Sequence, residues 1–190
     1  MLQPLLDELE RRPPRRAMGE QRPEAAVALI FVADPDRLLL ILRAERADDP
    51  WSGHLALPGG RRHTSDADLL ATAMRETREE TGIALMRSWC RAELDDLIPL
   101  TPTLPPIMVR PFVFVAPAAG EPMPNTEVVT ANWQPLSRLM AAGVYGNRTV
   151  DVRGAPRNVA GYQLDEGFLW GMTERILSPV LSRWKELQRG

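Results

Sequence analysis

Two continuous apolar runs near the start of the chain constrain its fold more than any other feature. Residues 25–32 read AAVALIFV, residues 37–44 read RLLLILRA, and the turn-forming sequence DPD lies between them. Apolar runs without polar alternation are typical of strands that are buried on both faces. The sequence therefore predicts an antiparallel hairpin inside a sheet that is covered on both sides.

Helical and extended patterns alternate along the rest of the chain. Leucines at helical spacing predict a short N-terminal helix, at Leu2, Leu5, Leu6 and Leu9. The other expected elements are strands within 83–100, 107–117 and 127–134, a short helix from about 135, a hairpin of 148–154 and 157–164, and a helix over 169–187 that Pro179 bends or divides. Strands before, between and after the helices indicate an α/β or α+β fold in which helices pack on a mixed sheet.

The central helix is predicted to follow a loop rich in glycine and proline. Ser65 or Asp66 can cap its N-terminus, Asp68 suits its first turn, and Gly82 ends it. In the strand expected at 107–117, Pro111 is compatible with an edge or a bulge only, because proline cannot donate to a ladder.

The length of 190 residues favours one domain. We expect residues 1–24 to form the N-terminal helix and a solvated Arg/Pro-rich linker, and residues 25–190 to form the main domain. The formal net charge of −2 gives no general attraction to nucleic acid or to an anionic membrane. No apolar run approaches the roughly 20 residues that span a bilayer, and the start of the chain lacks the apolar core of a secretory signal.

The single cysteine, Cys90, excludes an intramolecular disulfide and a cysteine-based zinc site, and it fits a reducing compartment. We therefore expect a cytoplasmic protein that acts on a small molecule, without nucleic-acid or membrane partners. A homodimer is left open.

The stretch RETREETG places three acids within little more than one turn of the predicted helix, at Glu76, Glu79 and Glu80. Like charges at such spacings destabilise a helix by about 0.2–0.5 kcal/mol per pair. Carboxylate oxygens are hard ligands that suit Mg2+ or Mn2+, so the cluster predicts a metal platform. The alternative is an exposed acidic face that Arg75 and Arg78 neutralise.

The sequence GGRRHTSDADLLATAMRETREETGI resembles the signature of the Nudix hydrolases, which runs Gly, five residues, Glu, seven residues, and then Arg-Glu-apolar-any-Glu-Glu-any-Gly-apolar. Its second half matches at Arg75, Glu76, Glu79, Glu80, Gly82 and Ile83, with Thr77 at the first apolar site. In the first half the loop is one residue longer, so the expected Glu falls on Ala67, and Asp66 or Asp68 stands in for it. The resemblance implies the Nudix fold, a mixed sheet sandwiched between helices, for residues 25–190.

The upstream sequence LILRAERADDPWSGHLALPGG also resembles the coenzyme A pyrophosphatase branch of this family. That branch has an Arg-Ser or Arg-Ala pair, then a Gly, and four residues later an aromatic-Pro-Gly-Gly. Here these places are taken by Arg43-Ala44, Gly53 and Leu57-Pro58-Gly59-Gly60. The spacing after Arg43 is one residue longer than in that branch, and its middle Arg is missing near Asp48 and Asp49.

The resemblance implies hydrolysis, dependent on Mg2+ or Mn2+, of the diphosphate bond in a nucleoside diphosphate linked to another moiety. In the coenzyme A branch the reaction yields 3',5'-ADP and 4'-phosphopantetheine. Alternatives are a nucleoside diphosphate sugar or a dinucleotide as substrate, or a nucleotide-binding module without catalysis.

The resemblance and the reaction chemistry together suggest roles for individual residues. Glu76 and Glu80 are expected to hold the metal, with help from Glu79 and from the Gly60 carbonyl. Arg75 is expected to orient the acids through an ion pair with Glu79.

The general base is expected to be Glu76, Glu79 or an acid from a distant loop, for which Glu127 is the best candidate. Arg43, Arg61 and Arg62 could bind phosphate as planar forks, although Arg61 and Arg62 suit a solvated surface equally well.

Aromatic residues offer stacking surfaces for a base. Trp51 lies in the loop beside the proposed site and could stack there or pack locally, whereas Trp133 and Trp170 are expected to pack in the core. His54 and His63, in the same loop region, are expected to be polar scaffolding.

Overall fold

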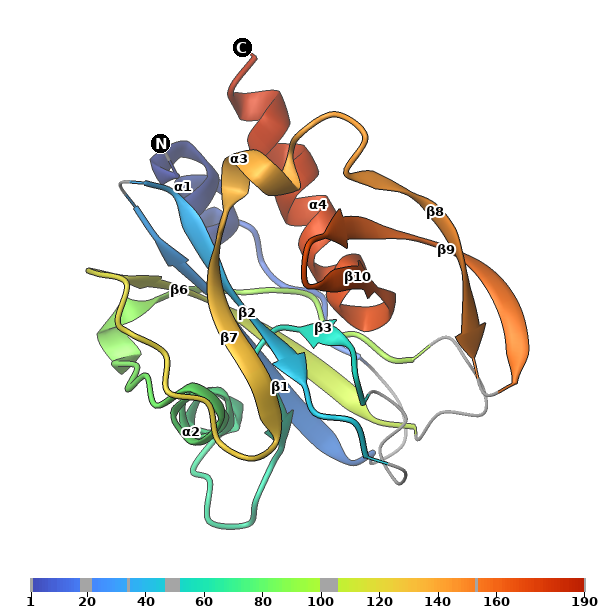
Figure 1. The fold of residues 1–190 in the computed structure, drawn as a ribbon. Helices are drawn as coiled ribbons and strands as arrows, with labels where there is room; N and C mark the ends of the chain where they lie inside the picture. Colours follow the sequence, from blue (N-terminus) through green and yellow to red (C-terminus); the bar gives the residue numbers. More distant parts are fainter. Residues whose placement is uncertain are drawn as a thin grey trace.

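The computed structural model describes residues 2–17, 22–33, 35–46, 52–99, 106–152 and 154–189, and Figure 1 shows their mixed α/β arrangement. In chain order the elements are α1 (Gln3–Arg11), β1 (Glu24–Val32), β2 (Arg37–Arg43), β3 (Leu55–Ala56), β4 (Gly59–Arg61), α2 (Leu69–Thr81), the 3-10 helix η1 (Arg87–Trp89), β5 (Cys90–Glu93), β6 (Met108–Ala116), β7 (Val128–Pro135), α3 (Leu136–Leu139), β8 (Tyr145–Val152), β9 (Ala155–Leu164), β10 (Gly167–Trp170) and α4 (Gly171–Leu187).

A seven-stranded mixed sheet forms the centre of the molecule, in the order β3-β2-β1-β6-β5, with β4 beside β1 and β7 beside β2. β1 and β6 are parallel along their whole length. The predicted hairpin is confirmed: β1 and β2 pair at Phe31–Leu38 and Val32–Arg37, beside the turn. Farther from the turn, β1 pairs with β4, and this places the two glycines of β4 against the central strand.

Helices cover both faces of this sheet, so the predicted fold class is confirmed. α2 lies against one face, where Ala73 joins Ala26, Ile30 and Phe112 in one buried cluster. α1 and α4 cover the other face, together with a three-stranded sheet of order β10-β9-β8 (Figure 1). β1 is buried at nearly every position because both of its faces are covered, which explains why residues 25–32 lack polar alternation.

The central helix begins later than the sequence predicted. α2 starts at Leu69, and its N-cap is Asp68, whose Oδ1 accepts a hydrogen bond from the Ala71 N–H at 2.7 Å. The prediction that Ser65 or Asp66 caps this helix, with Asp68 in its first turn, is wrong. Asp66 does not cap the helix because its carboxylate binds the Arg75 guanidinium instead.

Gly82 ends α2 where the sequence predicted, whereas Pro111 and Pro179 lie inside a strand and a helix that continue past them. Gly82 ends α2 with a φ of 72°, the left-handed conformation that glycine adopts readily, as predicted. The prediction of an edge or a bulge at Pro111 is wrong: β6 lies between β1 and β5, and Pro111 pairs in register with Val27 of β1. Its carbonyl accepts the Leu94 N–H at 2.9 Å just after β5 has ended. α4 continues through Pro179 as one helix. Residues 169–170, which were expected to begin this helix, instead end strand β10.

In the described part of the chain, no helix has the length and apolarity needed to cross a bilayer.

The N-terminal segment is tied to the main domain. The four leucines of the predicted apolar stripe are buried in the same core as α4. Residues 12–17 are mostly exposed, as expected of a linker, yet two aspartates hold them. Asp95 accepts the Arg15 N–H at 2.8 Å, and Asp96 accepts the Ala17 N–H at 3.1 Å and the Arg110 guanidinium at 2.7 Å.

Candidate active site

Two glycines of β4 bring the backbone against two glutamates of α2. The Gly59 N–H donates a hydrogen bond to Glu80 Oε2 at 2.8 Å. A methyl group built on Gly60 would lie 2.5 Å from the Glu76 carboxyl carbon, so this carboxylate rests directly on the glycine. The loop and the helix that the sequence predicted to form one site therefore do meet.

The two glutamates lie where negative charge is costly. Only 2% of the Glu80 surface is exposed, and burial raises its pKa to about 7, although the Gly59 N–H and the Arg43 guanidinium favour the charged form. Burial also raises the pKa of Glu76, against the opposing effect of Arg75. Two neighbouring carboxylates with raised pKa values indicate a place where a cation would be strongly stabilised.

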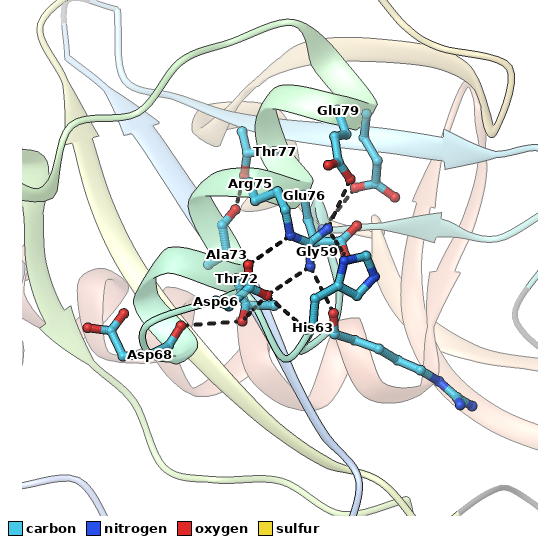
Figure 2. Close-up of polar contacts among 12 residues, drawn as sticks. Gly59, His63, Asp66, Asp68, Thr72, Ala73, Arg75, Glu76, Thr77 and Glu79 are labelled. Atoms are coloured by element: carbon cyan, nitrogen blue, oxygen red, sulfur yellow. Dashed lines mark hydrogen bonds and ion pairs between the residues drawn. The ribbon is translucent and has the colours of Figure 1, made fainter.

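Arg75 lies among three acids and one backbone carbonyl, as Figure 2 shows. Its guanidinium is 3.0 Å from Asp66 Oδ1, 2.8 Å from Glu76 Oε1 and 3.0 Å from Glu79 Oε2. Its Nη2 also donates to the Arg61 carbonyl oxygen at 2.9 Å. The hydrogen bonds with Asp66 and the charge of Glu76 raise the pKa of Arg75 above its already high value. Arg75 therefore joins the glycine-rich loop to α2 and holds two acids of the helix in place.

Asp66 and Asp68 have different partners, which settles a choice that the sequence left open. Asp66 is buried, and its Oδ2 accepts the His63 N–H and the Thr72 hydroxyl, both at 2.9 Å. Together with the Arg75 hydrogen bond, which has the largest effect, these contacts hold the pKa of Asp66 well below its usual value. Asp68, in contrast, caps α2 and pairs with an arginine at the surface. Asp66 is the acid that orients Arg75.

Replacing Asp66 with asparagine is expected to lower the free energy of unfolding by about 2 kcal/mol, because it weakens the hydrogen bonds that this buried carboxylate accepts from Arg75 and Thr72, although Arg75 keeps its ion pairs with two glutamates. Because its pKa is lowered in the folded state, Asp66 stabilises the protein above the unfolded pKa of 3.8, and this stability is lost as the pH falls. Urea unfolding at pH 7 and pH 3 measures both effects. Asp68→Asn is the matched control: asparagine caps a helix as well as aspartate does, so only the exposed ion pair with Arg87 is lost, at a cost below about 1 kcal/mol. Equal losses in the two variants would contradict the different roles.

Glu127 and two arginines lie at the edge of the site. Arg43 Nη1 is 3.4 Å from Glu80 Oε1. The Ala44 N–H donates to the Glu127 carbonyl at 2.8 Å, and the Glu127 carboxylate pairs with Arg46 at 3.1 Å. The charge of Glu127 is close enough to contribute to the raised pKa of Glu80. The structure thus brings the distant-loop acid to the site and adds Arg46, to which no sequence motif pointed.

The other residues expected to contact substrate lie farther out or are already paired. Arg61 is exposed and contacts Arg75 through its backbone carbonyl. Arg62 pairs at 2.8 Å with the glutamate that begins β1. Trp51 lies outside the described residues. Trp133 and Trp170 are half-buried, and the Trp133 Nε1 donates to a backbone carbonyl at 2.8 Å.

The donor set fits a hard divalent cation bound in an open site. Glu76 and Glu80 offer carboxylate oxygens, and the Glu79 side chain, 52% exposed, adds a third group on the solvent side. Among the described residues, no group of three or more His, Cys, Asp or Glu side chains is arranged to hold a metal ion, so the protein itself would supply only part of the coordination. Mg2+ is commonly held by one or two carboxylates together with waters and substrate phosphates, which is what this open arrangement allows.

Comparison with known protein families supports the same interpretation. The sequence model described as the NUDIX domain matches residues 22–150. An uncharacterized Nudix hydrolase, NudL, from Photorhabdus laumondii subsp. laumondii is 28% identical over 171 residues, which cover 90% of this chain and 89% of that protein. The uncharacterized protein C14C4.10c of Schizosaccharomyces pombe is 38% identical over 109 residues, or 54% of this chain. The match spans 33% of that longer relative.

Solved structures share the fold at low sequence identity. A MutT/nudix family protein from Enterococcus faecalis superposes with a TM-score of 0.64 and 16% identity, over 98% of this chain and 70% of that one. A bifunctional NMN adenylyltransferase/ADP ribose pyrophosphatase from Francisella tularensis, complexed with AMP and a Mn ion, gives a TM-score of 0.60 and 18% identity. That match covers 88% of this chain and 43% of the other, so this chain spans less than half of that protein.

Proposed function

The chain belongs to the Nudix family of hydrolases, and we propose that it hydrolyses the diphosphate bond of a nucleoside diphosphate linked to another moiety, with Mg2+ or Mn2+ as cofactor. The observation that carries this proposal is the pair of glutamates, Glu76 and Glu80, held against the backbone of Gly59 and Gly60. A bound divalent cation would supply positive charge that neutralises the diphosphate oxygens and lowers the pKa of the attacking water.

Residues of this chain have separate proposed roles in binding the metal and in positioning its ligands. Glu76 and Glu80 are the proposed metal ligands, assisted by Glu79 and by the Gly60 carbonyl. Because burial raises the pKa of Glu80 to about 7, cation binding near neutral pH releases a proton from Glu80. Arg75 keeps Glu76 and Glu79 in position and stays charged throughout.

At the edge of the site, Arg43 is the proposed phosphate contact, because its guanidinium already lies beside Glu80 and can present planar donors to a diphosphate held there. Coenzyme A is the leading substrate, since Arg43 and the two glycines of β4 belong to the sequence element that resembles the coenzyme A branch. ADP-ribose, nucleoside diphosphate sugars and dinucleotides are the alternatives, the first because the F. tularensis neighbour is named as an ADP ribose pyrophosphatase.

We expect the purified protein to cleave coenzyme A to 3',5'-ADP and 4'-phosphopantetheine in the presence of Mg2+ or Mn2+, and to be inactive with EDTA. The measurement is product identification by mass spectrometry after incubation with coenzyme A, ADP-ribose, a nucleoside diphosphate sugar and a dinucleotide. If the protein cleaves a sugar nucleotide and leaves coenzyme A intact, the assignment of coenzyme A as the substrate is wrong. The proposal that the protein hydrolyses a diphosphate bond would still hold. Binding without hydrolysis of every compound would point to a nucleotide-binding module instead.

A further inference from the structure

The segment between β6 and β7 carries Glu127 to the candidate active site, yet it is not anchored by a core of its own. In residues 117–127, which we call the β6–β7 loop, no side chain is buried and only two are half-buried. Figure 1 shows this loop passing one end of α2 before β7 begins. Few buried contacts give a segment low local stability, so the hydrogen bonds of the loop determine where it lies.

Two hydrogen bonds attach the first part of the loop to its surroundings. The Trp133 Nε1–H donates to the Gly120 carbonyl at 2.8 Å. The Met123 N–H donates at 2.8 Å to the carbonyl of Thr81, the last residue of α2. Met123 also rests on Gly82, where a methyl group would lie 3.2 Å from the Met123 Cβ. The loop is therefore attached to β7 through one side chain and to the C-terminal end of α2 through its backbone.

The end of the loop places Glu127 beside the metal-binding helix. The Glu127 N–H donates to Asn125 Oδ1 at 2.9 Å, and the Glu127 carbonyl accepts the Ala44 N–H at 2.8 Å. Its carboxylate pairs with Arg46 at 3.1 Å, and its negative charge acts on Glu80. Because the same loop is bound to the end of α2, its attachments set the position of Glu127 relative to the acids of that helix.

Trp133 can hold the loop because its own ring is fixed independently of the loop. Trp133 lies in β7 opposite Leu39 of β2, and it is half-buried against the cluster that contains Ala73 of α2. An indole N–H is a donor only, and a half-buried one needs an acceptor. If the Gly120 carbonyl moved away, this donor would lose the partner that it has in the structure. Of the two attachments of the first part of the loop, this one alone is made by a side chain.

We propose that Trp133 is a positioning residue: by binding the Gly120 carbonyl it keeps the β6–β7 loop against the end of α2, and thereby keeps Glu127 at the proposed metal site. This inference rests on the proposed function, because Glu127 is the candidate general base. It gives Trp133 a role beyond core packing. Removing the indole donor should displace Glu127 without removing any group that contacts the substrate.

Hydrogen exchange of the metal-free protein, followed by NMR, tests the position of the loop without any need for hydrolysis. Trp133→Phe keeps an aromatic ring and removes the donor. The hydrogen-bonded amides of Met123 and Glu127 are expected to exchange at least about 3-fold faster in this variant, as the loss of one hydrogen bond implies, while the amides of β1 exchange as in the wild type. Trp89→Phe is the matched control, because Trp89 is half-buried against the same cluster and makes no side-chain hydrogen bond within the described residues.

Steady-state kinetics with a nucleotide that the wild type cleaves give the second test. Trp133→Phe should lower kcat about 3- to 10-fold with KM unchanged, because Glu127 occupies its working position less often. Its melting temperature should stay close to that of the wild type. In a protein that already carries Glu127→Gln, Trp133→Phe should have no further effect on kcat, as expected when one residue acts through the other. Trp89→Phe should leave both constants unchanged.

The two measurements separate this inference from the proposed function. A wild type that cleaves none of the nucleotides would contradict the proposed function, and hydrogen exchange would still decide whether Trp133 holds the loop. Unchanged exchange of the Met123 and Glu127 amides in Trp133→Phe would overturn the inference even in an active enzyme. Equal losses of kcat from Trp133→Phe in the presence and absence of Glu127 would also overturn it, because a purely structural role affects both proteins alike.

Discussion

Replacing Glu80 with glutamine is expected to stabilise the metal-free protein at pH 8 while lowering hydrolysis at least about 100-fold. Removing a group that only supports a metal ligand typically costs about 10- to 100-fold, so the loss of a ligand itself should reach at least the upper end of that range. The opposite signs of the two effects have one cause, the burial of this carboxylate beside Glu76.

The direction of the stability change comes from the pKa of Glu80, which burial raises from 4.5 to about 7 in the folded protein. Below pH 4.5 the group is protonated in both states, and its raised pKa costs nothing. As the pH rises to about 7, the unfolded chain loses the proton while the folded chain keeps it, so stability falls. At about 1.4 kcal/mol for each pH unit, the full cost is about 3 kcal/mol.

Glutamine removes this pH dependence. It can still accept the Gly59 N–H but cannot neutralise Arg43, so we expect a net gain of about 2 kcal/mol at pH 8. For a chain of this size, that gain is a rise of about 4–8 °C in melting temperature. The two proteins should melt alike at pH 4.5. Adding MgCl2 or MnCl2 should raise the melting temperature of the wild type at pH 8 and leave that of the variant unchanged.

Glu79→Gln is the control, because this side chain is 52% exposed and its replacement removes a charge without relieving burial. It should leave the pH dependence of the melting temperature unchanged. A Glu80→Gln protein that is less stable at every pH, or that hydrolyses substrate at the wild-type rate, would remove Glu80 from the proposed metal site.

Replacing Glu127 with glutamine is expected to lower kcat about 100-fold with little change in KM. A loss of about 100-fold is the lower limit of what a general base contributes to the rate. Glu76 and Glu79 are both bound by Arg75 and come from the same helix. Glu127 comes from the chain just before β7, so it approaches Glu80 from a different element. Its exposed ion pair with Arg46 is worth at most about 1 kcal/mol and does not prevent it from accepting a proton.

Steady-state kinetics on the variant, with Glu121→Gln as the control, measure this effect. Glu121 is an exposed acid in the same connection that is not part of the site. If Glu127→Gln keeps its kcat and raises KM instead, Glu127 contacts substrate or its counterions, and the base is one of the helix acids.

The sequence was most informative where local pattern and burial agree. The runs at 25–32 and 37–44 predicted two central strands because a strand covered on both faces can tolerate few polar residues. The end of α2 was predictable from Gly82, whose left-handed conformation suits glycine far better than other residues. The meeting of the acidic helix with the glycine-rich loop was also anticipated.

The sequence was less informative wherever the role of a side chain depends on a partner far away in the chain. Asp66 and Asp68 have the same side chain two positions apart, and either could cap a helix. What separates them is the guanidinium of Arg75, whose position depends on the packing of α2 against β4. Local propensity cannot encode that contact.

The order of the strands in the sheets and the register of their pairing could not be predicted from the sequence either. The pairing of β7 with β2 brings Glu127 to the site and puts Trp133 opposite Leu39. A shift of one residue would turn the Trp133 ring to the other face of the sheet, because successive side chains alternate between faces. The sequence predicted the strand itself but not the face that Trp133 occupies.

Gly59 limits how this chain can change over evolutionary time. Its φ is 154°, and a methyl group there would lie 2.6 Å from the Val27 Cα, an atom of the central strand that cannot move aside without separating β1 from β6. Codons for other amino acids at this position are therefore expected to be eliminated in every lineage.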